Sequence, residues 1–198
     1  MILLIIAILI HVYATYTTYE RVKLNGTRYR RPLYDLIHDN TPNLSKYSKW
    51  VDILLVIFIL PYILNYNLRY VMHFINVFSI IIILRSIALL MTDIPTSDVS
   101  CDPRKISIYN LFFGHCSDKI FSGHTSFTLL AVLVAYNFNL LDNMQLLLLG
   151  IVQISYALLI IMTRCHYSVD VLLSYYIVIP LYYCILHLSD ILDHNKIF

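Results

Sequence analysis

Two short groups of polar residues in an otherwise apolar chain carry the side chains best suited to chemistry. In the first, residues 166–170, a histidine and an aspartate stand four apart, so they share one face if this stretch opens a helix. The carboxylate of Asp170 would accept a hydrogen bond from one ring nitrogen of His166, fix its tautomer and leave the other nitrogen as a nucleophile or base. The alternative is an ordinary polar helix start, in which the helix dipole favours Asp170.

The second group, Ser122-Gly123-His124-Thr125, is placed to open another helix. Gly123 lets the backbone approach a ligand closely, and Ser122 with the free N–H groups of a helix start can hold a phosphate. His124 can then protonate a leaving oxygen or deprotonate an attacking hydroxyl. The alternative is a serine N-cap followed by an incidental histidine.

The chain around these groups has the composition of a membrane protein. Of its 198 residues, 59% are hydrophobic and only 13% are charged, whereas roughly a quarter are charged in a soluble domain. A spanning helix needs roughly 20 mostly apolar residues. The first run has no Lys or Arg ahead of it and no small-residue cleavage site, so we expect a retained helix rather than a signal peptide. The runs predict six helices, at about 1–19, 51–68, 70–92, 123–141, 143–163 and 168–189.

The predicted fold is an all-α membrane protein, a single domain over residues 1–198 that forms a bundle of six transmembrane helices. Six spans place both termini on one side and the three longer connections on the other, at about 20–50, 93–122 and 164–170. His124 and His166 then lie at helix starts on one membrane face, where ionisable groups are costly and usually functional. Phosphoryl transfer needs a nucleophile, an acid/base and an anion cradle together, so we expect the active site at this face.

Charge and cysteine content exclude some function classes. The net charge of +2 gives no argument for nucleic-acid binding, and none of the four cysteines forms a CxxC pair, so we expect no nucleic acid, no zinc and no cofactor. Cys101 and Cys116 fall in one predicted loop. They can form a disulfide in an oxidising lumen or remain free thiols, and both alternatives stay open, as does a homo-oligomer.

Four stretches of the chain resemble, in order and spacing, the conserved motifs of sphingomyelin synthases. Residues 116–125 strongly resemble the third motif, and residues 166–171 resemble the fourth, with Ser168 where threonine is usual. Residues 84–95 resemble the second motif, and residues 32–42 are a looser match to the first. That family is part of the type 2 phosphatidic acid phosphatase superfamily.

The resemblance implies a metal-independent enzyme of six helices that moves phosphocholine from phosphatidylcholine to ceramide and releases diacylglycerol. Carried over by motif, His166 would attack the head-group phosphorus and form a phosphohistidine, with Asp170 orienting it. His124 would be the acid toward diacylglycerol and then the base toward ceramide. The remaining expected contacts to the substrate come from Ser122, Gly123, Arg85, Lys119, Arg164 and Tyr167. Arg85 interrupts an apolar helix, and snorkelling to the interface is its alternative role.

Two other functions stay open beside this one. A lipid phosphate phosphatase would use water as the acceptor, but the Lys-x6-Arg-Pro motif of the phosphatases is missing upstream of His124. Arg31-Pro32 has Leu24 where the lysine would stand. A non-catalytic lipid-binding membrane protein is disfavoured by the intact histidines and Asp170. Choline, ethanolamine and inositol head groups are not discriminated by the sequence.

Two signals disagree on which side of the membrane the site faces. Of the 14 Lys and Arg, 11 lie on the histidine side, which favours the cytosol by the positive-inside rule. These are Arg21, Lys23, Arg28, Arg30, Arg31, Lys46, Lys49, Arg104, Lys105, Lys119 and Arg164. The glycosylation sequons at residues 25–27 and 43–45 and the family resemblance favour the lumen. We follow the resemblance and expect a multi-pass protein of the Golgi, endoplasmic reticulum or plasma membrane with a lumenal or exoplasmic site.

Overall fold

The computed structural model describes residues 1–25, 32–64, 67–98 and 119–194, with side chains described as far as Leu188. Within these ranges the regular structure is helical throughout, which confirms the predicted all-α class. The elements are α1 (Ile2–Asn25), α2 (Leu36–Asn40), the 3-10 turn η1 (Ser45–Tyr47), α3 (Ser48–Leu64), α4 (Leu68–Met91), α6 (Gly123–Asn137), α7 (Asn143–Met162) and α8 (Ser168–His194).

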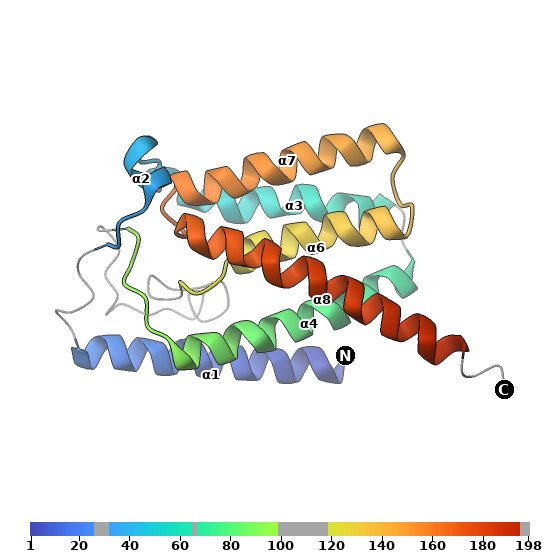
Figure 1. Ribbon diagram of the computed structural model, residues 1–198, viewed down its shortest axis with the longest axis horizontal. Helices are drawn as coiled ribbons and strands as arrows, with labels where there is room; N and C mark the ends of the chain where they lie inside the picture. Colours follow the sequence, from blue (N-terminus) through green and yellow to red (C-terminus); the bar gives the residue numbers. More distant parts are fainter. Residues whose placement is uncertain (26–31, 65–66, 99–118, 195–198) are drawn as a thin grey trace.

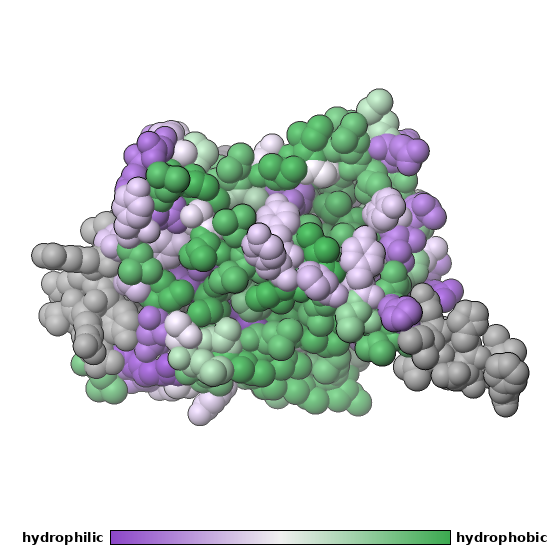
Figure 2. Space-filling model, in the orientation of Figure 1, coloured by the Kyte–Doolittle hydropathy of each residue, from purple (hydrophilic) through white to green (hydrophobic). Residues whose placement is uncertain are grey.

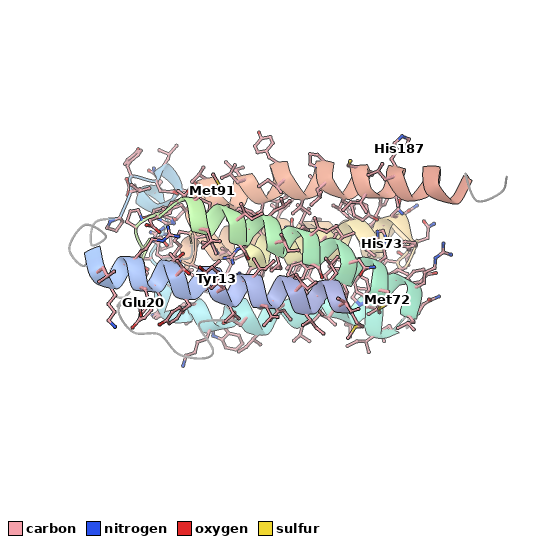
Figure 3. The ribbon with its side chains drawn as sticks, turned by 90° about the horizontal axis from the view of Figure 1, so that it is seen from below. Tyr13, Glu20, Met72, His73, Met91 and His187 are labelled. Atoms are coloured by element: carbon pink, nitrogen blue, oxygen red, sulfur yellow. The ribbon has the colours of Figure 1, made fainter. Side chains whose placement is uncertain are left out.

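The long helices lie along one axis, and consecutive helices alternate in direction (Figure 1). As a result α3, α6 and α8 begin where α1, α4 and α7 end, beside the short helix α2, and we call this end of the bundle the α2 end. In the perpendicular view, Glu20 and Met91 lie toward the α2 end, whereas Met72, His73 and His187 lie toward the other end (Figure 3). Helix α6 is central, because it packs against α3, α4, α7 and α8, while α1 packs on α4.

Five helices in the described part of the chain are long and apolar enough to cross a membrane. They cover Ile2–Leu24, Ser45–Leu64, Leu68–Met91, Asn143–Met162 and Ser168–Leu188. A broad apolar surface covers the middle of the molecule, with polar side chains gathered toward its two ends (Figure 2). Large apolar side chains such as Ile63 and Ile154 are 61% and 59% exposed. Soluble proteins rarely expose apolar patches of this size, so the chain is an integral membrane protein.

The fourth predicted span, 123–141, forms a shorter helix, α6, with 15 residues. It ends because Asn139 adopts a φ of +49°, a left-handed conformation that asparagine tolerates and that terminates helices. Fifteen residues rise about 22 Å, less than the roughly 30 Å hydrocarbon core of a bilayer. The predicted count of six spans is therefore not confirmed.

The other boundaries depart from prediction at polar residues. Helix α1 continues past its apolar run through Glu20, Arg21 and Lys23, because charged residues with straight side chains are good helix formers. Helix α2 lies inside the first predicted loop, where the sequence analysis expects no helix. Asp35 caps it, accepting hydrogen bonds from the backbone N–H groups of the second and third helical residues.

Candidate active site

Helices α6 and α8 begin side by side at the α2 end, which brings the two predicted polar groups together. The backbone N–H of Ser122 donates to the carbonyl of Asp170 at 3.2 Å, and the Ser174 hydroxyl donates to the carbonyl of Ser122 at 3.1 Å. The Ser122 side chain caps α6 by accepting from the N–H of Thr125 at 3.1 Å. Hydrogen bonds within the protein thus hold the first turns of both helices together.

The hydrogen bond expected between His166 and Asp170 is present. Nδ1 of His166 lies 3.3 Å from Oδ2 of Asp170, and the same carboxylate oxygen accepts from the N–H of Tyr167 at 3.1 Å. Asp170 is fully buried, and His166 is only 5% exposed. Because Nδ1 faces the carboxylate, Nε2 is the ring nitrogen available for attack on a substrate.

Burial and nearby positive charge both act on His166. Burial lowers the pKa of this imidazole well below its usual range, and the charges of Lys119, Arg85 and His124 lower the pKa further. His166 is therefore neutral at neutral pH, which is the form that has a lone pair for nucleophilic attack. The backbone contact between Ser122 and Asp170 holds the helix starts that bear His124 and His166 side by side.

His124 has a carboxylate partner of its own, which the sequence analysis did not anticipate. Its Nε2 lies 2.8 Å from Oδ1 of Asp52 in the first turns of α3, with the two side chains 16% and 30% exposed. Residues 124 and 52 come from different helices, so no local spacing joins them. The one available signal was a lone carboxylate at the start of an apolar run, where a charged side chain is costly and usually functional.

Arg85 points into the bundle rather than to a membrane interface. It is 4% exposed, and its Nε donates to the carbonyl of Phe121 at 2.9 Å, one residue before the cap of α6. A Cβ built on Gly123 would lie 3.5 Å from Nε of Arg85. The glycine therefore leaves room for this guanidinium beside the N-terminus of α6, and the snorkelling alternative does not describe Arg85.

The other three predicted substrate contacts divide into one that lies near His166 and two that join loops. Lys119 is 6% exposed and donates to the carbonyl of Cys165, next to His166. Arg164 has a φ of +59°, and its guanidinium donates to the carbonyl of His38 at 2.6 Å, so it holds the first loop. The Tyr167 hydroxyl donates to the carbonyl of Thr96 at 3.0 Å and accepts from the N–H of Leu33.

Asp35 caps two helices at once, and the sequence analysis did not identify it as a site residue. One oxygen accepts from the N–H groups that open α2, and the other accepts from the N–H and hydroxyl of Ser168 at 2.6 and 2.8 Å. Nε2 of the neighbouring His38 lies 3.1 Å from the carbonyl of His166. Burial alone would raise the pKa of Asp35, but the hydrogen bonds from Ser168 and His38 outweigh burial and lower the pKa. Asp35 is thus an ionised cap at the start of α8, where the helix dipole favours a negative charge.

Some predicted features fall outside the described residues. Cys101 and Cys116, with the disulfide and free-thiol alternatives, lie there, and so do two of the three residues of the sequon at 25–27. Within the part of the chain that the structure describes, no group of three or more His, Cys, Asp or Glu side chains is arranged to hold a metal ion. Asn43 of the second sequon is described and exposed, and its side chain accepts from the N–H of Ser45 at 2.9 Å.

Comparison with known proteins bears directly on this arrangement. Residues 115–188 match the family described as PAP2 superfamily C-terminal, a range that contains both histidines and Asp170. The predicted family resemblance is confirmed. The PAP2 match is joined by a relative in Trypanosoma cruzi (strain CL Brener), a phosphatidylinositol:ceramide inositolphosphotransferase that is 29% identical over 137 residues. That alignment covers 60% of this chain and 39% of the relative, so the chain spans about two fifths of the curated protein it matches. Both findings support a sphingomyelin synthase-like member of the PAP2 superfamily, while no solved structure matches the chain.

Proposed function

We propose that this protein transfers a phospholipid head group to ceramide and releases diacylglycerol, by way of a phosphohistidine at His166. The observation that carries the proposal is a buried, neutral His166 whose Nδ1 is held by Asp170 and whose neighbour is His124. The printed name of the T. cruzi relative, a ceramide phosphotransferase, supports ceramide as the acceptor.

In the first half of the reaction, Nε2 of His166 attacks the phosphorus of the donor lipid. The bond between phosphorus and the glycerol oxygen breaks, and a protonated His124 gives its proton to that oxygen, so diacylglycerol leaves. Because Nε2 of His124 faces Asp52, Nδ1 is the nitrogen that delivers the proton. The carboxylate of Asp52 stabilises the imidazolium before transfer and fixes the orientation of the ring.

In the second half, His124 is neutral and acts as the base. It takes the proton of the primary hydroxyl of ceramide while the oxygen attacks phosphorus, and the bond from phosphorus to His166 breaks. His166 returns to its neutral form and His124 to its protonated form, so each turnover restores the starting charges. Asp170 stabilises the positive charge that His166 carries while it is bonded to phosphorus.

The phosphate oxygens need positive partners during both steps. Arg85 and Lys119 are the two cations whose charges act on His166, and Arg85 lies beside the N-terminus of α6. Backbone N–H groups at that helix start, with the dipole behind them, add an anion cradle. We propose that Arg85, Lys119 and the first turn of α6 together stabilise the transferring phosphoryl group. Ser122, Arg164 and Tyr167 then serve mainly to hold the loops and helix starts in place.

Two head groups are the leading candidates. The motif resemblance favours phosphocholine from phosphatidylcholine, whereas the name of the relative favours inositol phosphate from phosphatidylinositol. Both use the same phosphoryl chemistry at His166, so they differ only in the pocket that holds the alcohol of the head group. We take phosphocholine as the first candidate, and the assay below compares both donor lipids.

The test uses the purified full chain in lipid vesicles with short-chain fluorescent ceramide and either donor. The expected result is a labelled sphingophospholipid with equimolar diacylglycerol and a phosphorylated histidine trapped in the absence of ceramide. His166→Ala abolishes both, whereas His187→Ala, an exposed histidine at the opposite end of the bundle, leaves both intact (Figure 3). Full product formation by His166→Ala would refute the mechanism.

A lipid phosphate phosphatase is the second candidate, because the PAP2 match covers both histidines without specifying the acceptor. Water would then take the place of ceramide in the second half of the reaction. Release of inorganic phosphate from phosphatidic acid, with no product from ceramide, would support this alternative over transfer.

We further propose that the α2 end faces the lumen or the outside of the cell. Tyr34 is 79% exposed in the first loop, so a Tyr34→Cys variant reports on the side of that loop. In sealed microsomes we expect an impermeant maleimide to modify it, above the wild-type background, only after permeabilisation. Immediate modification would instead place the site in the cytosol, in agreement with the loop charges.

A further inference from the structure

An apolar groove of about 460 Å³ lies between α3, α4 and α6. Helix α6 forms its floor with Phe127 and Ala131, and Phe58 of α3 and Phe74 of α4 form facing walls. Every side chain that lines the groove is aliphatic or aromatic. Such a lining offers almost no partner to a charged head group and is compatible with a hydrocarbon chain.

The groove opens sideways, toward the membrane. Helices α3 and α4 each pack on α6 but make few contacts with one another, so the space between them is not closed. Both helices are candidate spans, and Ile59 and Ile63 on the α3 rim are 38% and 61% exposed. The opening therefore faces the hydrocarbon of the bilayer, where lipid chains are the available ligands.

The groove and the acid/base pair of the candidate active site share two helices. The same two helices that form its floor and one wall carry that pair, since α6 bears His124 and α3 bears Asp52. Phe127 follows His124 by about 4.5 Å of helix rise, and Phe58 follows Asp52 by about 9 Å. The nearest residues of the groove thus lie about one to two helical turns along α6 and α3 from the His124–Asp52 pair.

We infer that this groove holds one hydrocarbon chain of the glycerophospholipid donor while its phosphate lies between His166 and His124. The inference rests on the proposed function, in which His124 protonates the glycerol oxygen that carries the two acyl chains. Because the groove residues nearest to His124 and Asp52 lie within about two helical turns of them, an acyl chain attached to that oxygen is long enough to reach the groove. The donor then enters from the bilayer through the gap between α3 and α4 without leaving the membrane.

Photolabelling tests occupancy independently of turnover. A phosphatidylcholine with a diazirine in the middle of one acyl chain is incorporated into vesicles with the wild-type chain and with His166→Ala. We expect crosslinks in both proteins within residues 58–63, 71–74 and 127–131. Crosslinks confined to outward faces such as that of Ile154 on α7 would overturn the inference. A ceramide probe that labels these residues while the donor does not would also overturn it, by assigning the groove to the acceptor.

Chain-length dependence tests the same groove by kinetics. Ile63→Trp narrows the groove mouth at a side chain that is 61% exposed, and the matched control is Ile154→Trp on α7, at a side chain 59% exposed. We expect the Ile63 variant to lower the ratio of kcat/KM for a long-chain over a dihexanoyl donor on the order of tenfold, in the lower part of the cost of forcing extra bulk into a packed contact. The Ile154 variant should leave that ratio unchanged. An unchanged ratio in the Ile63 variant, with transfer to ceramide intact, would refute acyl-chain binding in the groove but not the proposed function. Labelling of the groove in a chain that transfers no head group would refute the proposed function but not acyl-chain binding in the groove.

Discussion

Replacing Asp52 with asparagine removes the charge that faces His124 and keeps the shape of the side chain. Nε2 of His124 lies 2.8 Å from the Asp52 carboxylate, a short contact of the charge-assisted kind. An amide in its place cannot stabilise an imidazolium. The imidazolium of His124, which must give its proton to the glycerol oxygen, loses its carboxylate partner, and we expect the first half of the reaction to slow.

The size of the effect follows from the geometry. Hydrogen bonds to charged groups contribute about 1.5–3 kcal/mol, which corresponds to roughly 10- to 100-fold in rate. The Asp52 side chain is 30% exposed, so water screens part of the interaction and the loss should fall in the lower part of this range. Asp170 is fully buried, and Asp170→Asn should therefore cost more than Asp52→Asn.

The assay separates an acid role from a general loss of structure. Donor cleavage is measured with a natural phospholipid and with a choline phosphodiester whose leaving group is p-nitrophenol. A good leaving group departs without protonation, so Asp52→Asn should slow the natural donor and spare the activated one. Asp39→Asn, an exposed carboxylate on α2, is the matched control and should behave as wild type on both.

A double-mutant cycle with His124→Ala tests whether Asp52 acts through His124. If Asp52 acts only through His124, its substitution costs nothing further once His124 is gone. An equal loss from Asp52→Asn in both backgrounds, or an equal loss on both donors, would show that the carboxylate does not work through this histidine.

Substitutions at three further positions test other contacts of the candidate site. Lys119→Gln removes a charge that lowers the pKa of His166, so the pKa of His166 should rise. Activity needs neutral His166 and is lost as the pH falls through this pKa. The acid limb of the kcat/KM profile should therefore lie at higher pH in the variant than in wild type. Gly123→Ala should keep kcat/KM within about threefold, since its Cβ would lie 3.5 Å from Arg85, whereas Gly123→Val should displace Arg85 and cost on the order of tenfold, one charge-assisted contact. Asp35→Ala removes the cap of α8, and a thermal unfolding assay in detergent should show a loss of about 1–2 kcal/mol together with a fall in kcat.

Matched variants keep these results interpretable. Lys46→Gln removes an exposed cation from the same end of the bundle and should leave the acid limb in place, so a limb that moves equally in both variants reflects net charge alone. Asp35→Asn retains an oxygen able to cap and should lose less stability than Asp35→Ala. Equal unfolding midpoints for Asp35→Ala and wild type would show that Ser168 does not depend on this carboxylate.

The sequence was informative where chemistry depends on local spacing. His166 and Asp170 lie four residues apart on one helix start, so their contact could be predicted from helix geometry alone. The apolar runs predicted the long helices, and alternating direction predicted which ends gather at one face. The end of α6 depends on the backbone of one residue, Asn139, and no apolar pattern records such a change.

The parts that were missed depend on pairs far apart in the chain. Asp52 meets His124 across 72 positions, and Asp35 meets Ser168 across 133. Each carboxylate looks unremarkable in its own segment, because nothing local identifies the partner that it will meet after folding. Arg85 shows the same limit, since only its contact with Phe121 distinguishes a cation of the site from one that snorkels.

The double cap at Asp35 also couples two segments that lie far apart in the chain. One carboxylate oxygen caps α2, and the other accepts from Ser168 at the start of α8, 133 positions further on. The start of α8, with His166 beside it, is therefore fixed to the first loop only when both segments have folded and met. Under the proposed function, a chain that has formed its other helices still lacks a complete catalytic centre until this contact is made.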